Sequence, residues 1–269
     1  GTGGTYRVAY NGNGDVMACG AFTNAGGTPA NGFARWNGTA WQNPGLGVSA
    51  VGYAMLTLPN GHVIAGGSFS VNGNAADYVA RWDGAFWTIL GASMNGMVRS
   101  VAALSTGDLV AGGDFTTIGA TIVNRVARWD GATWQALGAG VDANVHSLAV
   151  RTNGDLIAGG AFLHAGGGFA YRIASWNGAS WSAFATGMDD VVRTVCALPG
   201  GLVFAGGDFG YADRVHVKRV GLWNGSHWST LEPVAPWPSV PGTVRTMLRL
   251  SNGDLIVGGD FPLTGAGSC

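Results

Sequence analysis

Short runs of hydrophobic residues that end in small residues recur six times along the chain. These runs are DVMACGAF at 15–22, HVIAGGSF at 62–69, DLVAGGDF at 108–115, DLIAGGAF at 155–162, LVFAGGDF at 202–209 and DLIVGGDF at 254–261. The glycine before each run lies at position 14, 61, 107, 154, 201 or 253, so the intervals are 47, 46, 47, 47 and 52 residues. A fixed period of this length indicates a repeat architecture.

A second block follows each of the first five runs. It reads ARWNGTAW at 34–41, ARWDGAFW at 80–87, ARWDGATW at 127–134, ASWNGASW at 174–181 and GLWNGSHW at 221–228. In each block an Asn-Gly or Asp-Gly pair stands between two Trp-bearing segments. This dipeptide favours a type I′ turn, in which both central residues have positive φ. The sequence therefore predicts five β-hairpins in the same register.

Each repeat predicts four short strands. In the third repeat these are VRSVAAL (98–104), DLVAGGDF (108–115), RVARW (125–129) and a strand beginning TWQAL (133–137), with a loop between the second and the third. The paired glycines of the second strand allow a neighbouring backbone to approach closely. Four strands in roughly 47 residues is the size of a β-propeller blade. We expect the two Trp of each repeat to pack between blades.

These patterns predict an all-β fold, a single β-propeller domain over residues 1–269. The repeats cover approximately 5–47, 48–95, 96–142, 143–189, 190–239 and 240–269. The last repeat stops after its second strand, so the expectation is six blades with an incomplete last blade. The alternative is part of a seven-bladed ring whose chain continues past Cys269.

The residues of the repeat resemble a known family. A hydrophobic run ending in Gly-Gly, an aromatic residue about fifteen positions later and a Trp about six positions after that resemble the kelch repeat and the galactose-oxidase-type propeller. The pattern GGxF…ARWxGxxW is also similar to repeats of extracellular bacterial proteins and of the fungal cortical polarity-marker family. The resemblance implies partner binding. It does not imply oxidase activity, because the three Cys and five His do not match the copper site of those oxidases.

Composition narrows the choice of fold further. Glycine supplies 48 of 269 residues, roughly 18%, against a usual value of about 7%. The chain has one lysine, Lys218, and one glutamate, Glu232. Exposed helix faces depend on these two residue types, so a helical bundle and a doubly wound α/β fold are excluded. A hydrophobic content of 47% also excludes disorder.

Charge and hydropathy exclude two kinds of partner. The formal net charge is −1, which creates no field that would attract nucleic acid. No apolar run reaches the roughly 18 residues that a membrane span requires. We therefore expect no nucleic-acid partner and no membrane span.

One position in the predicted first strands carries side chains able to bind a ligand. Eight residues before each aligned glycine stand Tyr6, Tyr53, Arg99, His146, Arg193 and Arg245. If the first strands are innermost, these side chains form a rim at or near the mouth of the propeller channel. Clustered arginines bind carboxylate and phosphate groups. The rim is therefore predicted to bind an anionic small ligand or an acidic partner side chain. The alternative is a solvated edge, or side chains that stack on neighbouring aromatics.

An acidic residue follows Gly-Gly in three repeats. These residues are Asp114, Asp208 and Asp260, and the other repeats have Ala21, Ser68 and Ala161. We interpret the aspartates as caps of backbone N–H groups in the following loop. The spacing of a calcium loop is absent, so no metal site is predicted. The pair Asp189-Asp190 is expected to lie on a solvated turn.

The longest interval contains a proline-rich insertion, LEPVAPWPSVPG at 231–242. Four prolines stiffen this segment around Trp237, which is the only Trp outside the repeat blocks. A rigid loop with an unshared Trp predicts a contact with a protein or a glycan. The alternative is that Trp237 folds back over the fifth repeat.

Patterns typical of catalysis are scarce. The five His occupy unrelated repeat positions, one Glu leaves paired-carboxylate chemistry to Asp, and neither G-x-S-x-G nor H-E-x-x-H occurs. We expect no cofactor, no catalytic residues and no metal. The disulfide state of Cys19, Cys196 and Cys269 stays open.

The predicted function is a non-catalytic binding or scaffolding module that mediates protein–protein interaction. We expect it to be secreted or on the cell surface, and to belong to a larger polypeptide or assembly. One alternative is a carbohydrate-binding, lectin-like propeller. The other is an enzyme with a site at the channel mouth.

Overall fold

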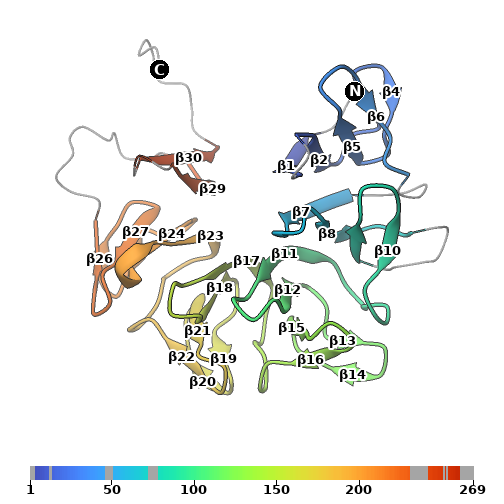
Figure 1. The fold of residues 1–269 in the computed structure, drawn as a ribbon. Helices are drawn as coiled ribbons and strands as arrows, with labels where there is room; N and C mark the ends of the chain where they lie inside the picture. Colours follow the sequence, from blue (N-terminus) through green and yellow to red (C-terminus); the bar gives the residue numbers. More distant parts are fainter. Residues whose placement is uncertain are drawn as a thin grey trace, which may run out of the picture. The chain divides into compact units, whose positions relative to one another are not determined.

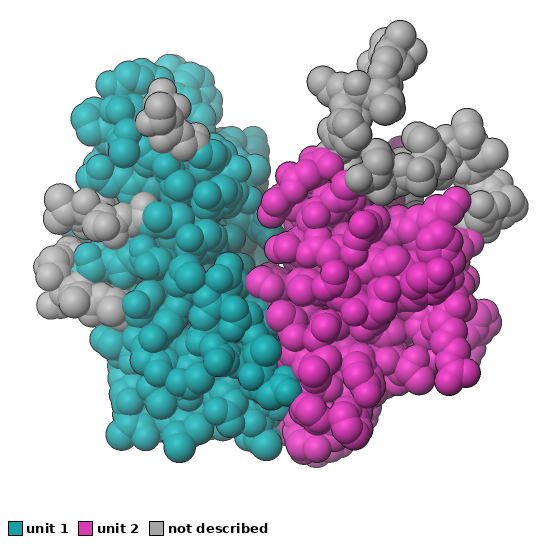
Figure 2. Space-filling model, turned by 180° about the vertical axis from the view of Figure 1, so that it is seen from behind, with its two compact units in different colours: residues 1–145 teal, residues 146–269 magenta. Residues whose placement is uncertain are grey.

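The fold is built almost entirely from short β-strands. The computed structural model describes residues 4–11, 14–45, 51–71, 78–230, 242–250, 252 and 254–260. Within them the helical content is one 3-10 turn at Pro199–Gly201 (Figure 1). The chain divides into two compact units, Gly1–Val145 and His146–Cys269, coloured separately in Figure 2.

Five four-stranded antiparallel sheets, one for each of the first five repeats, form blades 1 to 5. Unit 1 holds blades 1 to 3. Blade 1 has β1 (Thr5–Tyr10), β2 (Val16–Gly20), β5 (Phe33–Trp36) and β6 (Trp41–Gln42), and blade 2 has β7 (Val51–Thr57), β8 (Val63–Ser68), β9 (Val79–Trp82) and β10 (Trp87–Ile89). Blade 3 has β11 (Val98–Ala103), β12 (Leu109–Gly113), β15 (Val126–Trp129) and β16 (Trp134–Ala136). Blade 4 has β17 (Val145–Val150), β18 (Leu156–Gly160), β21 (Ile173–Trp176) and β22 (Trp181–Ala183), and blade 5 of unit 2 has β23 (Val192–Ala197), β24 (Val203–Gly207), β27 (Val220–Trp223) and β28 (Trp228–Ser229).

The sixth repeat contributes two strands to the described residues, β29 (Val244–Arg249) and β30 (Leu255–Gly259), which pair with each other. In every blade the strands lie in chain order across the sheet, from the first strand at one edge to the fourth at the other. The predicted all-β propeller with four-stranded blades is confirmed.

A Gly-Gly pair ends the second strand of every repeat except the first, which has Cys19-Gly20, and the two glycines make room for different neighbours. A side chain on Gly113 would collide with the carbonyl oxygen of Met97, which precedes the first strand of the same blade. A Cβ on Gly66 of blade 2 would lie 2.6 Å from Cγ1 of Val98 in blade 3. The predicted close approach of a neighbouring backbone is confirmed. The first glycine of the pair, such as Gly66, also lets the next blade pack against the sheet.

Hydrophobic clusters lie between adjacent blades. In unit 1, one cluster joins Phe33 of blade 1 to Trp87 of blade 2, and another surrounds Phe115 at the junction of blades 2 and 3. In unit 2, a cluster around Phe209 joins blades 4 and 5. Adjacent blades of one unit thus bury facing sides against each other, which a single blade cannot do alone.

The two Trp of each of the first five repeats pair across the third and fourth strands, with ring centroids 5.4–5.7 Å apart. The second Trp also reaches the preceding blade. Trp134 Nε1 donates to the Leu90 carbonyl oxygen at 2.7 Å. Trp228 Nε1 donates to the Phe184 carbonyl oxygen at 3.3 Å. For these blades the expected packing of Trp between blades is confirmed.

The hairpin turn between the Trp residues differs from the prediction. In blade 3 the pair Trp129–Trp134 closes a turn of four residues, and only Gly131 has positive φ, at 100°. Asp130 Oδ1 accepts hydrogen bonds from the backbone N–H groups of Ala132 and Thr133 at 2.9 and 2.8 Å. The type I′ assignment is wrong because the carboxylate stabilises an Asx-type turn instead.

The loop between the second and third strands was expected to carry no strands of its own. In four blades it contains a two-stranded hairpin that sequence analysis missed. These hairpins are β3 (Asn24–Ala25) with β4 (Thr28–Pro29), β13 (Thr117–Ile118) with β14 (Thr121–Ile122), β19 (His164–Ala165) with β20 (Gly168–Phe169), and β25 (Tyr211–Ala212) with β26 (Val215–His216).

Two consecutive residues in the left-handed region lead into the third strand. In blade 3 they are Asn124, with φ 45°, and Arg125, with φ 75°. This conformation costs a non-glycine residue roughly 1 kcal/mol. The guanidinium of Arg125 offsets part of that cost, because Nη1 donates to the carbonyl oxygen of Asp114. The equivalent Arg172 Nη1 donates to the Ala161 carbonyl oxygen at 3.0 Å.

Candidate functional site

The predicted rim residues share one backbone feature, a β-bulge in the first strand. In β1, β7, β11, β23 and β29 the register shifts by one residue, and the extra residues are Tyr6, Tyr53, Arg99, Arg193 and Arg245. A bulged residue has no partner in the ladder and its side chain is redirected. His146, the sixth predicted residue, is the second residue of β17.

In unit 1 the structure brings three of these side chains together. The rings of Tyr6 and Tyr53 stack with centroids 5.5 Å apart and an interplanar angle of 6°. Arg99 Cζ lies 5.9 Å from the centroid of the Tyr53 ring, in a cation–π contact. Tyr6, Tyr53 and Arg99, which we call the bulge row, thus form a continuous stack across blades 1 to 3. Tyr6 at its end is 44% exposed.

Each bulged arginine also pairs with an aspartate of its own blade. Arg99 Nε and Nη2 donate to the two carboxylate oxygens of Asp114 at 2.6 and 2.7 Å. The aspartate is the residue after Gly-Gly, so its carboxylate serves the first strand. The interpretation of Asp114 as a cap of the loop is therefore wrong.

The same pair recurs in unit 2. Arg193 Nε donates to Asp208 Oδ2 at 2.8 Å. Arg245 Nε and Nη2 donate to the carboxylate of Asp260 at distances of 2.6–2.9 Å. Each pair spans 15 residues, and the blades with Tyr or His at the bulge position have Ala or Ser where the aspartate would stand. The two sets of candidate residues thus form one set of pairs.

These pairs determine the electrostatics of the site. The hydrogen bond with Asp114 raises the pKa of Arg99, and hydrogen bonds from Arg245 lower the pKa of Asp260. Each of these cations therefore already has a carboxylate partner. An anionic ligand would have to compete with that partner, and anion binding by the rim stays a prediction.

The loop caps come from another repeat position, twelve residues before the aligned glycine. Asn95 Oδ1 accepts from the N–H groups of Thr116 and Thr117 at 2.7 and 2.9 Å. Asp189 Oδ1 accepts from those of Gly210 and Tyr211, both at 2.9 Å. Asp189 and Asp190 are exposed on a bend, as predicted, and Asp189 has the additional role of capping the loop. The shared spacing of Asn95 and Asp189 was the sequence signal for the cap.

A hollow of about 450 Å³ in unit 2 adjoins one of the Arg–Asp pairs. Its charged lining consists of Asp189, Asp190, Asp208, His216, Lys218 and Arg219. Charges of both signs face this space, so it favours neither a simple anion nor a simple cation.

The remaining predicted residues bear on the site in other ways. Trp237 and Cys269 lie outside the described residues. Cys19 and Cys196 are free thiols, and burial raises the pKa of Cys19 to about 12. Among the described residues no three His, Cys, Asp or Glu side chains are grouped so that they could hold a metal ion. Nor is any helix there long and apolar enough to cross a lipid bilayer.

Comparison with known proteins places the chain among the β-propellers. A β-propeller domain of unknown function, DUF5122, matches residues 58–82. Solved structures match along nearly the whole chain. YCF48 bound to a D1 peptide has a TM-score of 0.57 and 13% identity, over 96% of this chain and 76% of that one.

Two structures named as enzymes have the same fold. A gluconolactonase from Xanthomonas campestris has a TM-score of 0.56 and 15% identity, over 95% of this chain and 82% of that one. A virginiamycin B lyase from Staphylococcus aureus has a TM-score of 0.54 and 11% identity, over 89% and 72%. No curated protein matches the sequence. At these identities the likeness shows the fold alone.

Proposed function

We propose that this chain is a non-catalytic binding module whose bulge row holds a segment of a protein partner. The observation that carries the proposal is the stack of Tyr6, Tyr53 and Arg99 across three blades. Tyr and Arg are enriched among the residues that dominate binding energy at protein interfaces. Rings that are already stacked lose little conformational freedom when a partner binds.

The charge of the row favours a polypeptide over a free anion. Arg99 is already paired with Asp114, so the row presents the exposed Tyr6, the ring edges of the stack and a neutralised ion pair. A peptide chain offers apolar side chains for the rings and backbone amides for the ion pair. The fold is compatible with such a function, since YCF48 is a propeller that binds a peptide.

The location and the repeat type belong to the same proposal. We place the protein outside the cell or on its surface, with kelch-like repeats. Scarce Lys and Glu and the resemblance to extracellular repeat proteins support this placement. Mass spectrometry of washed cells and culture medium of the source organism tests it. Recovery of the protein from the cytoplasmic fraction alone would contradict it.

A displayed peptide library selected on the immobilised chain tests the binding function. We expect enriched peptides whose affinity falls at least about tenfold on Tyr53→Ala, which removes both contacts of the row. Phe169→Ala is the matched control, because Phe169 is 67% exposed on a hairpin of unit 2. Enrichment of no peptide, or equal affinity for Tyr53→Ala and the wild type, would refute the proposal.

A further inference from the structure

The junction between blades 1 and 2 departs from the pattern of the other blades. Where blade 2 meets blade 3, Leu90 follows the fourth strand, and its side chain is 6% exposed. Where blade 4 meets blade 5, Phe184 has the same place and is 3% exposed. In both cases the carbonyl oxygen of this residue accepts the indole N–H of the next blade, so side chain and backbone together close the junction.

Blade 1 has Pro44 at the equivalent position, three residues after its second Trp. Proline has no N–H, so it cannot make the bond that Leu90 N makes to the Val79 carbonyl oxygen at 3.3 Å. Its ring is also smaller than the side chains of Leu90 and Phe184. Trp87, the partner across this junction, is 7% exposed, and its Nε1 has no hydrogen-bond partner.

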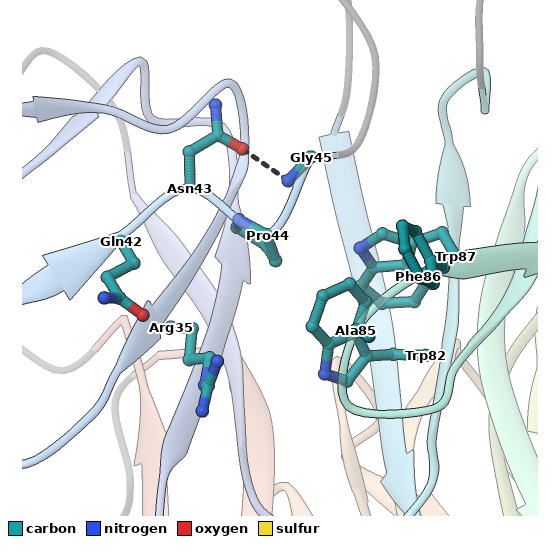
Figure 3. Close-up of a pocket in the computed structure, with 9 residues that line it drawn as sticks. All are labelled: Arg35, Gln42, Asn43, Pro44, Gly45, Trp82, Ala85, Phe86 and Trp87. Carbon is teal, nitrogen blue, oxygen red and sulfur yellow. Dashed lines mark hydrogen bonds between the residues drawn. The ribbon is translucent and has the colours of Figure 1, made fainter.

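A groove of about 370 Å³ opens at this junction. We call it the outer groove, and it is lined by Arg35, Gln42, Asn43, Pro44, Gly45, Trp82, Ala85, Phe86 and Trp87. Figure 3 shows its two walls. Gln42, Asn43 and Arg35 come from blade 1, and the three aromatic rings come from blade 2. The walls thus differ in chemistry, one being polar and the other aromatic.

The aromatic wall combines an exposed ring with unused donors. Phe86 is 74% exposed at the mouth of the groove. Trp82 and Trp87 are buried, and the Nε1 of each lacks a partner. In Figure 3 both indole nitrogens lie on the side of the rings that faces blade 1. A buried donor without a partner is costly, and because both nitrogens are shielded from solvent, a ligand oxygen bonds to them only where the neighbouring side chains move aside.

The polar wall carries hydrogen-bonding groups without a net charge. Arg35 Nε donates to Asp15 Oδ2 at 2.5 Å, which compensates the guanidinium. Asn43 Oδ1 accepts from Gly45 N at 2.8 Å, and in Figure 3 the amide nitrogen of Asn43 points away from the aromatic wall. Gln42 is exposed and brings both a donor and an acceptor.

We propose that the outer groove binds a neutral saccharide. A pyranose ring has an apolar C–H face, which fits the Phe86 ring, and hydroxyl groups that both donate and accept hydrogen bonds. The exposed amide of Gln42 matches those hydroxyl groups. The compensated charge of Arg35 disfavours an acidic sugar. This site is separate from the bulge row, and the proposal holds whether or not the row binds a peptide.

Titration calorimetry with four neutral oligosaccharides tests the proposal on the intact chain: cellohexaose, laminarihexaose, chitohexaose and mannohexaose. A hexamer of galacturonic acid is the acidic comparison, and a polyproline peptide tests an extended polypeptide as the occupant. We expect at least one neutral sugar to bind at concentrations up to about 10 mM, with weaker or no binding of the acidic sugar and the peptide.

Two variants locate the binding. Phe86→Ala removes the exposed ring, and Pro44→Leu installs the residue that closes the junction in blade 2. Each is expected to weaken sugar binding at least about tenfold. Phe169→Ala, a change of similar exposure in unit 2, should leave it unchanged. If Pro44→Leu does not fold, Phe86→Ala still decides, because an exposed side chain contributes little to folding.

Three results would overturn the proposal. One is that none of the four neutral sugars binds in this range. Another is that the acidic sugar or polyproline binds more tightly than every neutral sugar. The third is that sugar binding is unchanged in Phe86→Ala, which would place it elsewhere on the chain.

Discussion

The Arg–Asp pairs present one type of ion pair at different levels of burial, which makes their energetics testable. The side chains of Arg99 and Asp114 are 26% and 18% exposed, whereas those of Arg245 and Asp260 are 57% and 56% exposed. Both pairs have Nη2–Oδ2 distances between 2.6 and 2.7 Å. Geometry is therefore matched, and burial is the main difference between them.

A double-mutant cycle on the more buried pair, Arg99 and Asp114, measures the coupling between its members. Asp114→Ala leaves the half-buried guanidinium of Arg99 without its carboxylate, and we expect it to cost about 2 kcal/mol of unfolding free energy. Arg99→Ala alone leaves the carboxylate of Asp114 without its guanidinium. The double variant should lose less than the sum of the two, with a coupling of about 1.5 kcal/mol.

The same cycle on Arg245 and Asp260 should give a much smaller coupling, because water screens exposed charges. Urea unfolding, followed by Trp fluorescence, gives the free energies for both cycles. Raising the salt concentration to about 1 M should remove the coupling between Arg245 and Asp260. It should preserve most of the coupling between Arg99 and Asp114. Equal couplings for the two pairs, or a coupling between Arg99 and Asp114 below about 0.3 kcal/mol, would refute this reasoning.

Three further results are expected. Trp134→Phe removes an indole N–H that donates to a carbonyl oxygen of the preceding blade, whereas the N–H of Trp87 has no partner. Trp134→Phe should therefore lower the free energy of unfolding in urea by about 1 kcal/mol more than Trp87→Phe does. Equal losses of unfolding free energy would contradict this. In a variant with Cys196→Ser and Cys269→Ser, the Cys19 thiol, whose pKa burial raises to about 12, should react with Ellman's reagent only after unfolding. Rapid reaction of this variant in its native state would contradict the burial of Cys19. Since Arg245 holds the pKa of Asp260 below its ordinary value of 3.8, the stability that this pair contributes is present above pH 3.8 and is lost as the pH falls through the lower folded pKa. Asp260→Asn should abolish this part of the acid dependence of the urea unfolding midpoint. An unchanged acid dependence would contradict this.

The strands could be predicted from the sequence because every blade repeats the same constraints. Gly113 must be small where the first strand passes, and Phe115 must be buried between blades. Requirements of this kind recur at a fixed spacing, so they are visible without any knowledge of the tertiary structure. The turn type was not visible, because the carboxylate of Asp130 competes with the backbone preference of the Asp-Gly pair.

The left-handed residues before the third strand could not be predicted from their own chemistry. Arg125 and Arg172 have φ values of 75° and 76°, in a region that favours glycine. The contact of each guanidinium with a carbonyl oxygen of the same blade helps to hold them there, together with a backbone hydrogen bond from each N–H to Phe115 or Phe162. Blade 1 has Gly32 at this position with φ 81°, and comparison between the repeats was the one available hint.

The Arg–Asp pairs, in contrast, had a signal in the sequence. Wherever a repeat has arginine at the bulge position, aspartate follows 15 residues later, and wherever it has Tyr or His, that aspartate is missing. Positions that vary together between repeats of one chain indicate contact, as positions do between homologues. The Asp114 carboxylate therefore binds the arginine of its own blade and does not cap the loop as predicted.

The bulge explains why residues as different as Tyr and Arg occupy this position of the blade. A bulged residue has no cross-strand partner, so the ladder imposes no size or polarity on it. An arginine there needs an aspartate after Gly-Gly, and its charge is then committed to its own blade. A tyrosine needs no such partner, so Tyr6 and Tyr53 are the members of the bulge row whose polar and aromatic groups are not used by an ion pair. It follows that a partner bound by the row should depend more on Tyr53 than on Arg193 or Arg245, although all three occupy the same position in their blades.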